Sequence, residues 1–190
     1  MFQALQTLDG NILLFIQEFI RNDLLSAILV PYTHMADIGQ IWIIICAIAL
    51  LFRKTRKAGA FGLVSLLLGH IVNSEILKTL IQRPRPFLDV AGLVTIIDPP
   101  DSTSFPSGHS CASFAAVGAL LRVLRKENFW PKWGTVVLST MAVLMALSRI
   151  YVGVHYPTDI IAGSLVGLFC SWVVVRYGGP VYDRLEERRR

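Results

Sequence analysis

The segment Phe105-Pro106-Ser107-Gly108-His109 lies where a polar loop gives way to a long apolar run. A proline near a helix start is preset for the first turn and lacks only a donor that the helix does not use there. Ser107 and Gly108 leave backbone N–H groups at the positive end of the helix dipole, which favours an anion. The segment therefore predicts a helix N-terminus that presents N–H groups, a hydroxyl and the His109 imidazole to one phosphate.

The composition is that of a membrane protein rather than of a water-soluble domain. Of the 190 residues, 54% are hydrophobic and 16% are charged, a balance typical of polytopic membrane proteins. The net charge of +5 could suggest nucleic acid, but the basic residues gather in short loops between apolar runs, so we expect no such partner. The length suits one domain over residues 1–190, and no repeat of fixed period divides it.

The three cysteines lie inside separate apolar runs, at Cys46, Cys111 and Cys170. A cysteine in such a setting behaves as a small hydrophobic residue. We therefore expect three packing residues rather than a disulfide set or a metal site.

Five apolar segments are long enough to cross a bilayer once their flanks are included. These segments are residues 38–52, 59–81, 110–124, 133–149 and 158–175. Residues 3–20 have apolar positions at spacings of three and four, as in an amphipathic helix that lies at the membrane interface. Residues 24–32 are too few to span, and Pro31 is expected to end them. The prediction is an all-α, polytopic membrane helix bundle with five spanning helices, or six if residues 11–32 cross with a kink.

The basic residues indicate how this bundle lies in the membrane. Thirteen of the eighteen Lys and Arg residues fall on one side, at Arg53, Lys54, Arg56, Lys57, Arg122, Arg125, Lys126, Lys132, Arg176, Arg184, Arg188, Arg189 and Arg190. The positive-inside rule assigns that side to the cytoplasm. The other five fall on the opposite side, at Arg21, Lys78, Arg83, Arg85 and Arg149. A bound anion is the natural reason for cations to lie against the topological bias.

Three clusters of polar residues are expected to meet on that outer side. The second predicted span ends near Lys78 and Arg85, and the third begins at His109. The fourth ends at Arg149, and the fifth is entered through residues 155–159. Because successive spans alternate in direction, all of these residues reach the same membrane boundary.

The residue types in these clusters suit phosphoryl transfer. His155 stands just before a proline-initiated helix with Asp159 in its first turn. A carboxylate there can fix the tautomer of the imidazole and leave its other nitrogen free to attack. His109, on a different helix, is free to protonate a leaving oxygen. Phosphoryl transfer needs mainly positioning and charge stabilisation, which three cations and a helix N-terminus provide without a metal.

The spacing of these residues forms a three-part pattern across residues 78–159. Its positions are, in order, Lys78, Arg85-Pro86, Pro106-Ser107-Gly108-His109, Ser148-Arg149, His155 and Asp159. This pattern resembles the signature of the type-2 phosphatidic acid phosphatase superfamily, with no departure in order, spacing or residue type. The resemblance implies a membrane phosphatase core of the six-helix type that acts through a phosphohistidine and needs no metal or other cofactor.

The resemblance also implies a role for each signature residue. His155 is the nucleophile, Asp159 orients it, and His109 is the general acid that later activates water. The phosphate is held by the remaining residues, which are Lys78, Arg85, Arg149, Ser107 and the backbone of Gly108.

The expected function is that of an integral membrane lipid phosphatase in the plasma or inner membrane, with its site on the extracytoplasmic face. The compact chain and the outward site resemble undecaprenyl pyrophosphate phosphatases of this superfamily. Phosphatidylglycerophosphate and phosphatidate phosphatases share the signature and remain alternatives, as does a lipid phosphotransferase. A non-catalytic phospholipid-binding protein would need the cations but not a histidine–carboxylate pair. The oligomeric state is left open.

Several ionisable residues near the signature have less specific expectations. Arg83 is expected at the rim or on a lipid headgroup, because on a continuing helix Lys78 and Arg85 would share a face and Arg83 would not. Glu75, three residues before Lys78, is expected to neutralise it. His70 is expected to be a hydrogen-bonded packing residue.

Two further segments are expected near the entrance of the site. His34 and Asp37 lie at the outer boundary before the first predicted span and could line the substrate mouth. The linker of residues 87–104 is expected to cap the pocket from the side.

Overall fold

The computed structural model describes residues 2–127 and 130–188, and this part of the chain is helical with no β-strand. Its α-helices are α1 (Phe2–Phe15), α2 (Asp23–His34), α3 (Gln40–Leu51), α4 (Arg56–His70), α5 (Lys78–Ile81), α6 (Pro86–Asp89), α7 (Gly108–Leu124), α8 (Lys132–Tyr151) and α9 (Pro157–Glu187). Short π- or 3₁₀-helical segments lie at Ile16–Ile20, Asp37–Gly39, Ile71–Leu77 and Arg125–Glu127. The all-α prediction is confirmed. Arg189 and Arg190, part of the predicted basic tail, lie outside the described residues.

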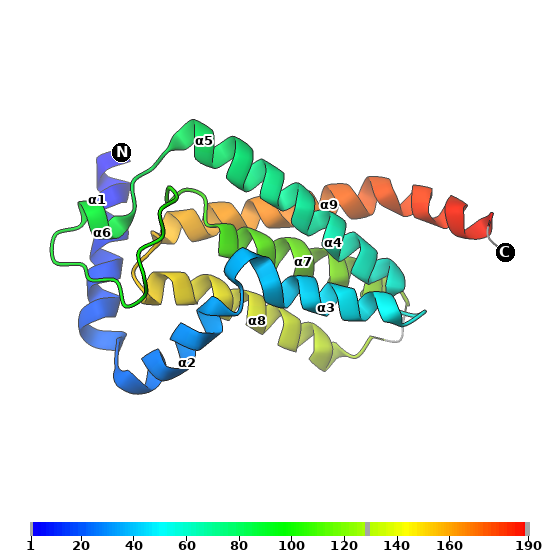
Figure 1. Ribbon diagram of the computed structural model, residues 1–190, viewed down its shortest axis with the longest axis horizontal. Helices are drawn as coiled ribbons and strands as arrows, with labels where there is room; N and C mark the ends of the chain where they lie inside the picture. Colours follow the sequence, from blue (N-terminus) through cyan, green and yellow to red (C-terminus); the bar gives the residue numbers. More distant parts are fainter. Residues whose placement is uncertain (1, 128–129, 189–190) are drawn as a thin grey trace.

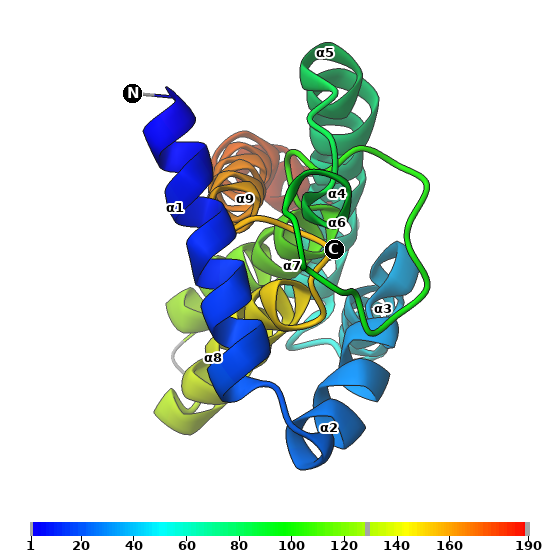
Figure 2. The same ribbon diagram turned by 90° about the vertical axis from the view of Figure 1, so that its left-hand side faces the viewer.

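Helix α7 is the centre of the bundle, with α3, α4, α8 and α9 around it (Figures 1 and 2). It is rich in small residues, and its buried positions include Ala115, Ala116, Gly118 and Ala119. Because small side chains leave room for neighbouring backbones, α7 can be surrounded by helices on several sides. The helix that begins within the segment Phe105–His109 is therefore the core element of the fold.

Two glycines let α9 pack directly against α7. Gly163 and Gly167 lie four residues apart and so share a face of α9. A Cβ at Gly163 would come within 3.2 Å of Ser107 N, and one at Gly167 within 2.8 Å of Ala115 N. The close approach brings the two helix starts together, and Ser107 N donates to the Asp159 carbonyl at 3.0 Å.

The predicted membrane bundle is confirmed, while the number of spans depends on how short helices are counted. Among the described residues, three helical stretches are long and apolar enough to cross, at residues 56–89, α8 and α9. Helices α2 and α3 form a pair bent by 54° that would make a fourth span. Helix α7 is apolar but has 17 residues. The total is therefore five only if α3 and α7 cross separately at their shorter lengths.

The N-terminal helix lies across one end of the bundle rather than along it (Figure 1). Its apolar residues Leu5, Leu8 and Phe15 are exposed, whereas Asp9 and Leu13 are buried against the protein. This is the arrangement predicted for an interfacial helix, with the apolar face available to lipid.

The segment after the N-terminal helix differs from the prediction. Helix α2 passes through Pro31 and ends at His34, so the expectation that Pro31 ends the helix was wrong. Proline removes only its own donor, and its carbonyl still accepts from Met35 N at 3.2 Å. The chain breaks between α1 and α2, and none of the candidate spans includes α1, so a single kinked span over residues 11–32 is not supported.

The three cysteines are free and buried, as the sequence predicted for packing residues. Cys46 contributes to the main apolar cluster, together with Trp42, Phe61 and Leu120. This cluster lies between α3, α4, α7 and α9 and holds the bundle together.

The glycine contact between α7 and α9 gives a prediction about stability. Gly167→Val should lower the melting temperature by several degrees, because overpacking a helix contact of this kind costs about 2 kcal/mol. Gly179→Ala is the matched control, since a Cβ there meets no atom within 4 Å. Thermal unfolding in detergent measures both, and equal melting temperatures for the two variants would contradict the packing argument.

Candidate active site

A cavity of about 590 Å³ opens at the end of the bundle that α1 crosses. Its polar end is lined by Asp37, Lys78, Arg85, Gly108, His109, Arg149 and His155. The wall that runs along the bundle is apolar and includes Ile43 of α3 and Leu63, Leu66 and Leu67 of α4. The cavity therefore suits a molecule that has a compact charged head and an apolar tail.

The loop before α7 holds two of the three cations in place. Lys78 Nζ donates to the Thr103 carbonyl at 2.5 Å. Arg85 Nε donates to the Ser102 carbonyl at 2.7 Å, and its Nη2 donates to Ser102 Oγ at 3.0 Å. The predicted cap, residues 87–104, thus does lie beside the cavity, and it fixes the cations that line it.

Arg149, the third cation, is almost fully buried and has spare donor capacity. Its Nη1 donates to Thr33 Oγ1 at 2.7 Å, while its buried Nε has no hydrogen-bond partner among the described residues. A buried donor without an acceptor costs free energy, so it favours any anion that reaches it. The part of the cavity wall that Arg149 forms is therefore suited to bind a phosphate oxygen.

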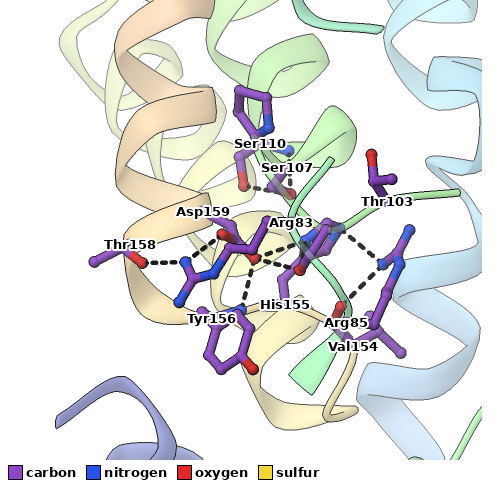
Figure 3. A network of polar contacts seen from close by, with 12 residues as sticks. Arg83, Arg85, Thr103, Ser107, Ser110, Val154, His155, Tyr156, Thr158 and Asp159 are labelled. Atoms are coloured by element: carbon purple, nitrogen blue, oxygen red, sulfur yellow. Dashed lines mark hydrogen bonds and ion pairs between the residues drawn. The ribbon is translucent and has the colours of Figure 1, made fainter. Parts of the chain in front are cut away.

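The tautomer of His155 follows from its two neighbours (Figure 3). Arg85 Nη1 lies 3.2 Å from His155 Nε2, and a guanidinium can only donate, so Nε2 must be the unprotonated nitrogen. The hydrogen is then on Nδ1, which lies 3.4 Å from Asp159 Oδ2. The lone pair of His155 is therefore on the side of the ring that faces the cations.

Asp159 is fully buried and accepts hydrogen bonds from several directions (Figure 3). Its Oδ2 accepts from Ser104 Oγ at 2.5 Å and from Tyr156 N at 2.9 Å. The bond from Tyr156 N is part of the N-terminal cap of α9, which starts at Pro157. The sequence forms a helix start here, and the same carboxylate that caps it also orients His155.

Arg83 differs from its expected position at the rim. It donates through Nη1 to Asp159 Oδ1 at 2.8 Å and through Nη2 to Asp9 Oδ2 at 3.0 Å. Its guanidinium also stacks on the ring of Tyr156, 3.7 Å from the centroid. In Figure 3 it lies on the far side of Asp159 from Arg85. Arg83 therefore ties α1 to the carboxylate behind His155, and it does not line the cavity.

His109 makes a contact that joins two distant segments. Its Nε2 lies 3.1 Å from Asp37 Oδ1, and the other oxygen of Asp37 lies 2.9 Å from His34 Nδ1. An ionised carboxylate only accepts, so the hydrogen of the His109 contact belongs to Nε2. Asp37 lines the cavity, as expected for the substrate mouth, and it also sets the orientation of His109.

Ser107 and Gly108 occupy different positions relative to the cavity. Ser107 is the N-cap of α7, is fully buried, and accepts from Ser110 N at 3.4 Å. It is not among the residues that line the cavity, whereas Gly108 is. The Ser107 hydroxyl therefore belongs to the N-terminal cap of α7, whereas Gly108 borders the cavity.

Two expectations about side chains of the second predicted span, those for Glu75 and His70, were wrong. The span itself ends after Ile81, as predicted, because Gln82 takes a left-handed conformation (φ 47°). Lys78 and Arg85 nevertheless line the same cavity. Glu75 does not pair with Lys78 but lies 3.5 Å from His70 Nε2, and both of these side chains are exposed. His70 is therefore not a packing residue, and the π-helical turn at Ile71–Leu77 brings Glu75, five residues further on, beside it.

Sequence reasoning missed the residues that support the cavity from outside the signature. Asp9 is the clearest case, because it is a buried acid that accepts from Thr158 N at 3.3 Å and from the Thr158 hydroxyl. Its position within an otherwise apolar helical face was the available signal. Thr33 and Ser104 carried no signal in their spacing.

The fold and the cavity together define a membrane protein with a cationic site beside an apolar wall. Residues 58–182 match the PAP2 superfamily. The undecaprenyl-diphosphatase of Sulfolobus acidocaldarius is 37% identical over 143 residues, which cover 74% of this chain and 66% of that protein. Phosphatidylglycerophosphatase B of Bacillus subtilis is 32% identical over 165 residues, which cover 82% of this chain and 76% of that protein.

A solved structure agrees with this match. The crystal structure of the PAP2-type phosphatidylglycerolphosphate phosphatase from Bacillus subtilis has a TM-score of 0.75 and 27% sequence identity to this chain. The similarity covers 94% of this chain and 88% of that one. The chain therefore belongs to the PAP2 superfamily and is a membrane lipid phosphatase.

The bridge from Arg83 to Asp9 and Asp159 gives a prediction about coupling. Arg83→Gln should lower the free energy of unfolding by about 3 kcal/mol, because it leaves two buried carboxylates without their cation. Asp9→Asn alone should be less harmful, and the double variant should lose less than the sum of the two. Chemical or thermal unfolding of the three variants measures the coupling, and strictly additive losses would contradict the bridge.

Proposed function

We propose that the chain hydrolyses the terminal phosphate of a lipid phosphate or pyrophosphate through a phosphohistidine on His155. The observation that carries this proposal is the pair of contacts on its ring. Asp159 Oδ2 lies 3.4 Å from Nδ1 of His155, and Arg85 Nη1 lies 3.2 Å from its Nε2. The donor-only guanidinium requires a lone pair on Nε2, so the nitrogen that would attack already faces the cations.

The proposed reaction has two steps. In the first, His155 Nε2 attacks phosphorus, the bond to the leaving oxygen breaks, and His109 in its protonated form gives that oxygen the proton on Nδ1 while Nε2–H stays on Asp37. In the second, His109 Nδ1 takes a proton from water, the water oxygen bonds to phosphorus, the bond between phosphorus and His155 Nε2 breaks, and inorganic phosphate leaves. Lys78, Arg85 and Arg149 would hold the phosphoryl oxygens, with the backbone at Gly108 completing the cradle.

Behind the reacting groups, Asp37 and Asp159 would act as positioning residues. Each accepts from one nitrogen of a histidine, Asp37 from His109 and Asp159 from His155. The imidazole in α7 and the one just before α9 would thus have fixed orientations before the substrate arrives, which lowers the entropic cost of reaching the transition state.

The proposed substrate is an isoprenoid or glycerolipid phosphate whose tail remains in the bilayer. The apolar wall of the cavity on α3 and α4 supports this, because a tail can lie there while the phosphate reaches the cations. Undecaprenyl pyrophosphate is our first choice, and phosphatidylglycerophosphate is the alternative. The two relatives described above, an undecaprenyl-diphosphatase and a phosphatidylglycerophosphatase, motivate both.

The orientation is also part of the proposal. Among the described residues, most of the cations lie at the end of the bundle away from the cavity, in the loops and in the helix segments beside them. The positive-inside rule would place those loops in the cytoplasm and the cavity at the extracytoplasmic face of the plasma membrane.

Replacement of the proposed nucleophile tests the mechanism. His155→Ala should lower phosphate release at least roughly a thousandfold, since removal of a nucleophile leaves only residual catalysis. The buried Cys170, which does not line the cavity, gives the control, and Cys170→Ala should retain activity. Phosphate release from purified protein on undecaprenyl pyrophosphate, phosphatidylglycerophosphate and phosphatidate measures both variants and ranks the substrates.

Full activity in His155→Ala would exclude the phosphohistidine, and loss of wild-type activity in EDTA would point to a metal enzyme.

The burial of His155 gives a prediction about pH. Burial lowers the pKa of His155 well below its ordinary value, and the hydrogen bond to Asp159 opposes that shift. Below a pH of about 6.5 the unfolded chain therefore binds a proton at this residue that the folded protein does not bind. Stability should fall as the pH drops from 7 to 5, and it should fall less in His155→Asn. Melting temperatures across this range measure the difference, and parallel curves would contradict it.

A further inference from the structure

A second cavity lies at the opposite end of the bundle from the proposed active site. It has a volume of about 410 Å³ and lies where α4, α7 and α9 come together. Arg122 of α7 lines this cavity and His109 of α7 lines the first one. Arg122 lies thirteen positions after His109, which corresponds to about 20 Å along the helix. One headgroup cannot occupy both cavities.

The second cavity is strongly cationic. Its lining includes Lys57, Arg122, Lys126 and Arg176, with Asp183 as the one acid among the residues that line it. Asp183 is already paired with Lys57 Nζ at 2.5 Å. The remaining three cations have no acid among the lining residues to neutralise them, so the space attracts an anion.

Arg122 is held in place as a preformed donor. Its Nη1 donates to the Gly118 carbonyl at 3.0 Å and to Ser171 Oγ at 2.8 Å. A Cβ at Gly118 would come within 2.8 Å of this nitrogen, so the glycine makes room for the guanidinium. Both hydrogen bonds use Nη1 and fix the orientation of the planar guanidinium. The N–H groups on Nε and Nη2 therefore point in a fixed direction, in which they can donate to a ligand.

The segment of α9 that lines the cavity contains residues that are unfavourable inside a helix. Helix α9 continues through Gly178, Gly179 and Pro180, although glycine and proline are the weakest helix formers. Neither glycine has positive φ, and a Cβ at Gly179 would meet no atom within 4 Å. Packing therefore does not require a glycine at 179, whereas a larger side chain would enter the cavity that Gly179 and Pro180 line.

The cavity also has an apolar side that meets the lipid-facing surface. Phe61, Val123, Trp172 and Val175 line it, and Trp172 is 45% exposed. Trp172 stacks on Phe169, at 6.0 Å between ring centroids. Exposed aromatic rings of this kind mark the boundary between headgroups and acyl chains.

We propose that this second cavity binds an anionic phospholipid by its phosphate group. The cations and the Arg122 fork take the phosphate, and the apolar side lets the acyl chains continue along α9 into the bilayer. A soluble anion would use the same cations but would gain nothing from Trp172 and Phe61. The lipid would belong to the leaflet at the basic end of the bundle. This site does not depend on the phosphatase reaction.

Binding of dioleoylphosphatidylglycerol to the purified full chain in detergent tests the proposal. Native mass spectrometry should show retained phosphatidylglycerol, and melting temperature should rise with this lipid but not with dioleoylphosphatidylcholine. Arg122→Gln should weaken the apparent affinity about tenfold, as expected for the loss of a charge-assisted hydrogen bond. Arg122→Lys, which keeps the charge but not the fork, should recover only part of it.

A second pair of variants keeps the test valid if Arg122→Gln does not fold. Lys126 and Arg176 are exposed, so the double variant Lys126→Gln/Arg176→Gln should fold and should bind the lipid more weakly. Its matched control is Arg125→Gln/Arg184→Gln, which removes the same charge from the same end of the bundle outside the cavity. Equal losses in the two double variants would overturn the proposal in favour of general surface charge.

Two further experiments distinguish lipid binding in the second cavity from binding in the first cavity and from binding of free phosphate. Lys78→Gln, which changes only the first cavity, should leave phosphatidylglycerol binding intact, and loss of binding there would overturn the assignment. Millimolar inorganic phosphate should not reproduce the thermal shift. A shift of equal size with phosphate alone that depended on Arg122 would also overturn the assignment to a lipid.

Discussion

The buried carboxylate of Asp159 is the interaction on which the rest of this structure depends. It accepts from Ser104, Tyr156 N and Arg83, and it lies beside Nδ1 of His155. A fully buried charge is stable only when hydrogen bonds and an opposite charge compensate it. His155 and Tyr156 precede α9, whereas Ser104 and Arg83 come from two other segments, so satisfying this one group requires the loop before α7, the start of α9 and the end of the α4–α5 stretch to meet.

Close helix packing makes that meeting possible. Gly163 and Gly167 let α9 lie directly on α7, and this contact sets the start of α9 beside the start of α7. The same end of the bundle is crossed by α1, whose buried Asp9 accepts from Arg83 (Figure 1). The interfacial helix is thus joined by an ion pair to the carboxylate behind His155, which links the membrane surface to the cavity.

The two ends of the bundle share one electrostatic feature, a cavity lined by cations. At one end, Lys78, Arg85 and Arg149 are buried or nearly so and are held by hydrogen bonds to the loop and to Thr33. At the other, Arg122 is held back against Gly118 beside more exposed cations. Fixed cations in a low-dielectric wall interact with phosphate much more strongly than flexible ones in water, so both ends suit anionic headgroups.

The sequence by itself determined the helical membrane class, the N-terminal interfacial helix and the gathering of Lys78, Arg85, His109, Arg149 and His155 at one end. These follow from apolar length, from spacing within a helix and from the alternation of helix direction. Only the tertiary structure decided the contact of Asp37 with His109, the inward position of Arg83 and the pairing of His70 with Glu75. Those outcomes depend on contacts between distant segments, or on a π-helical turn and a left-handed residue, and neither leaves a regular spacing in the sequence.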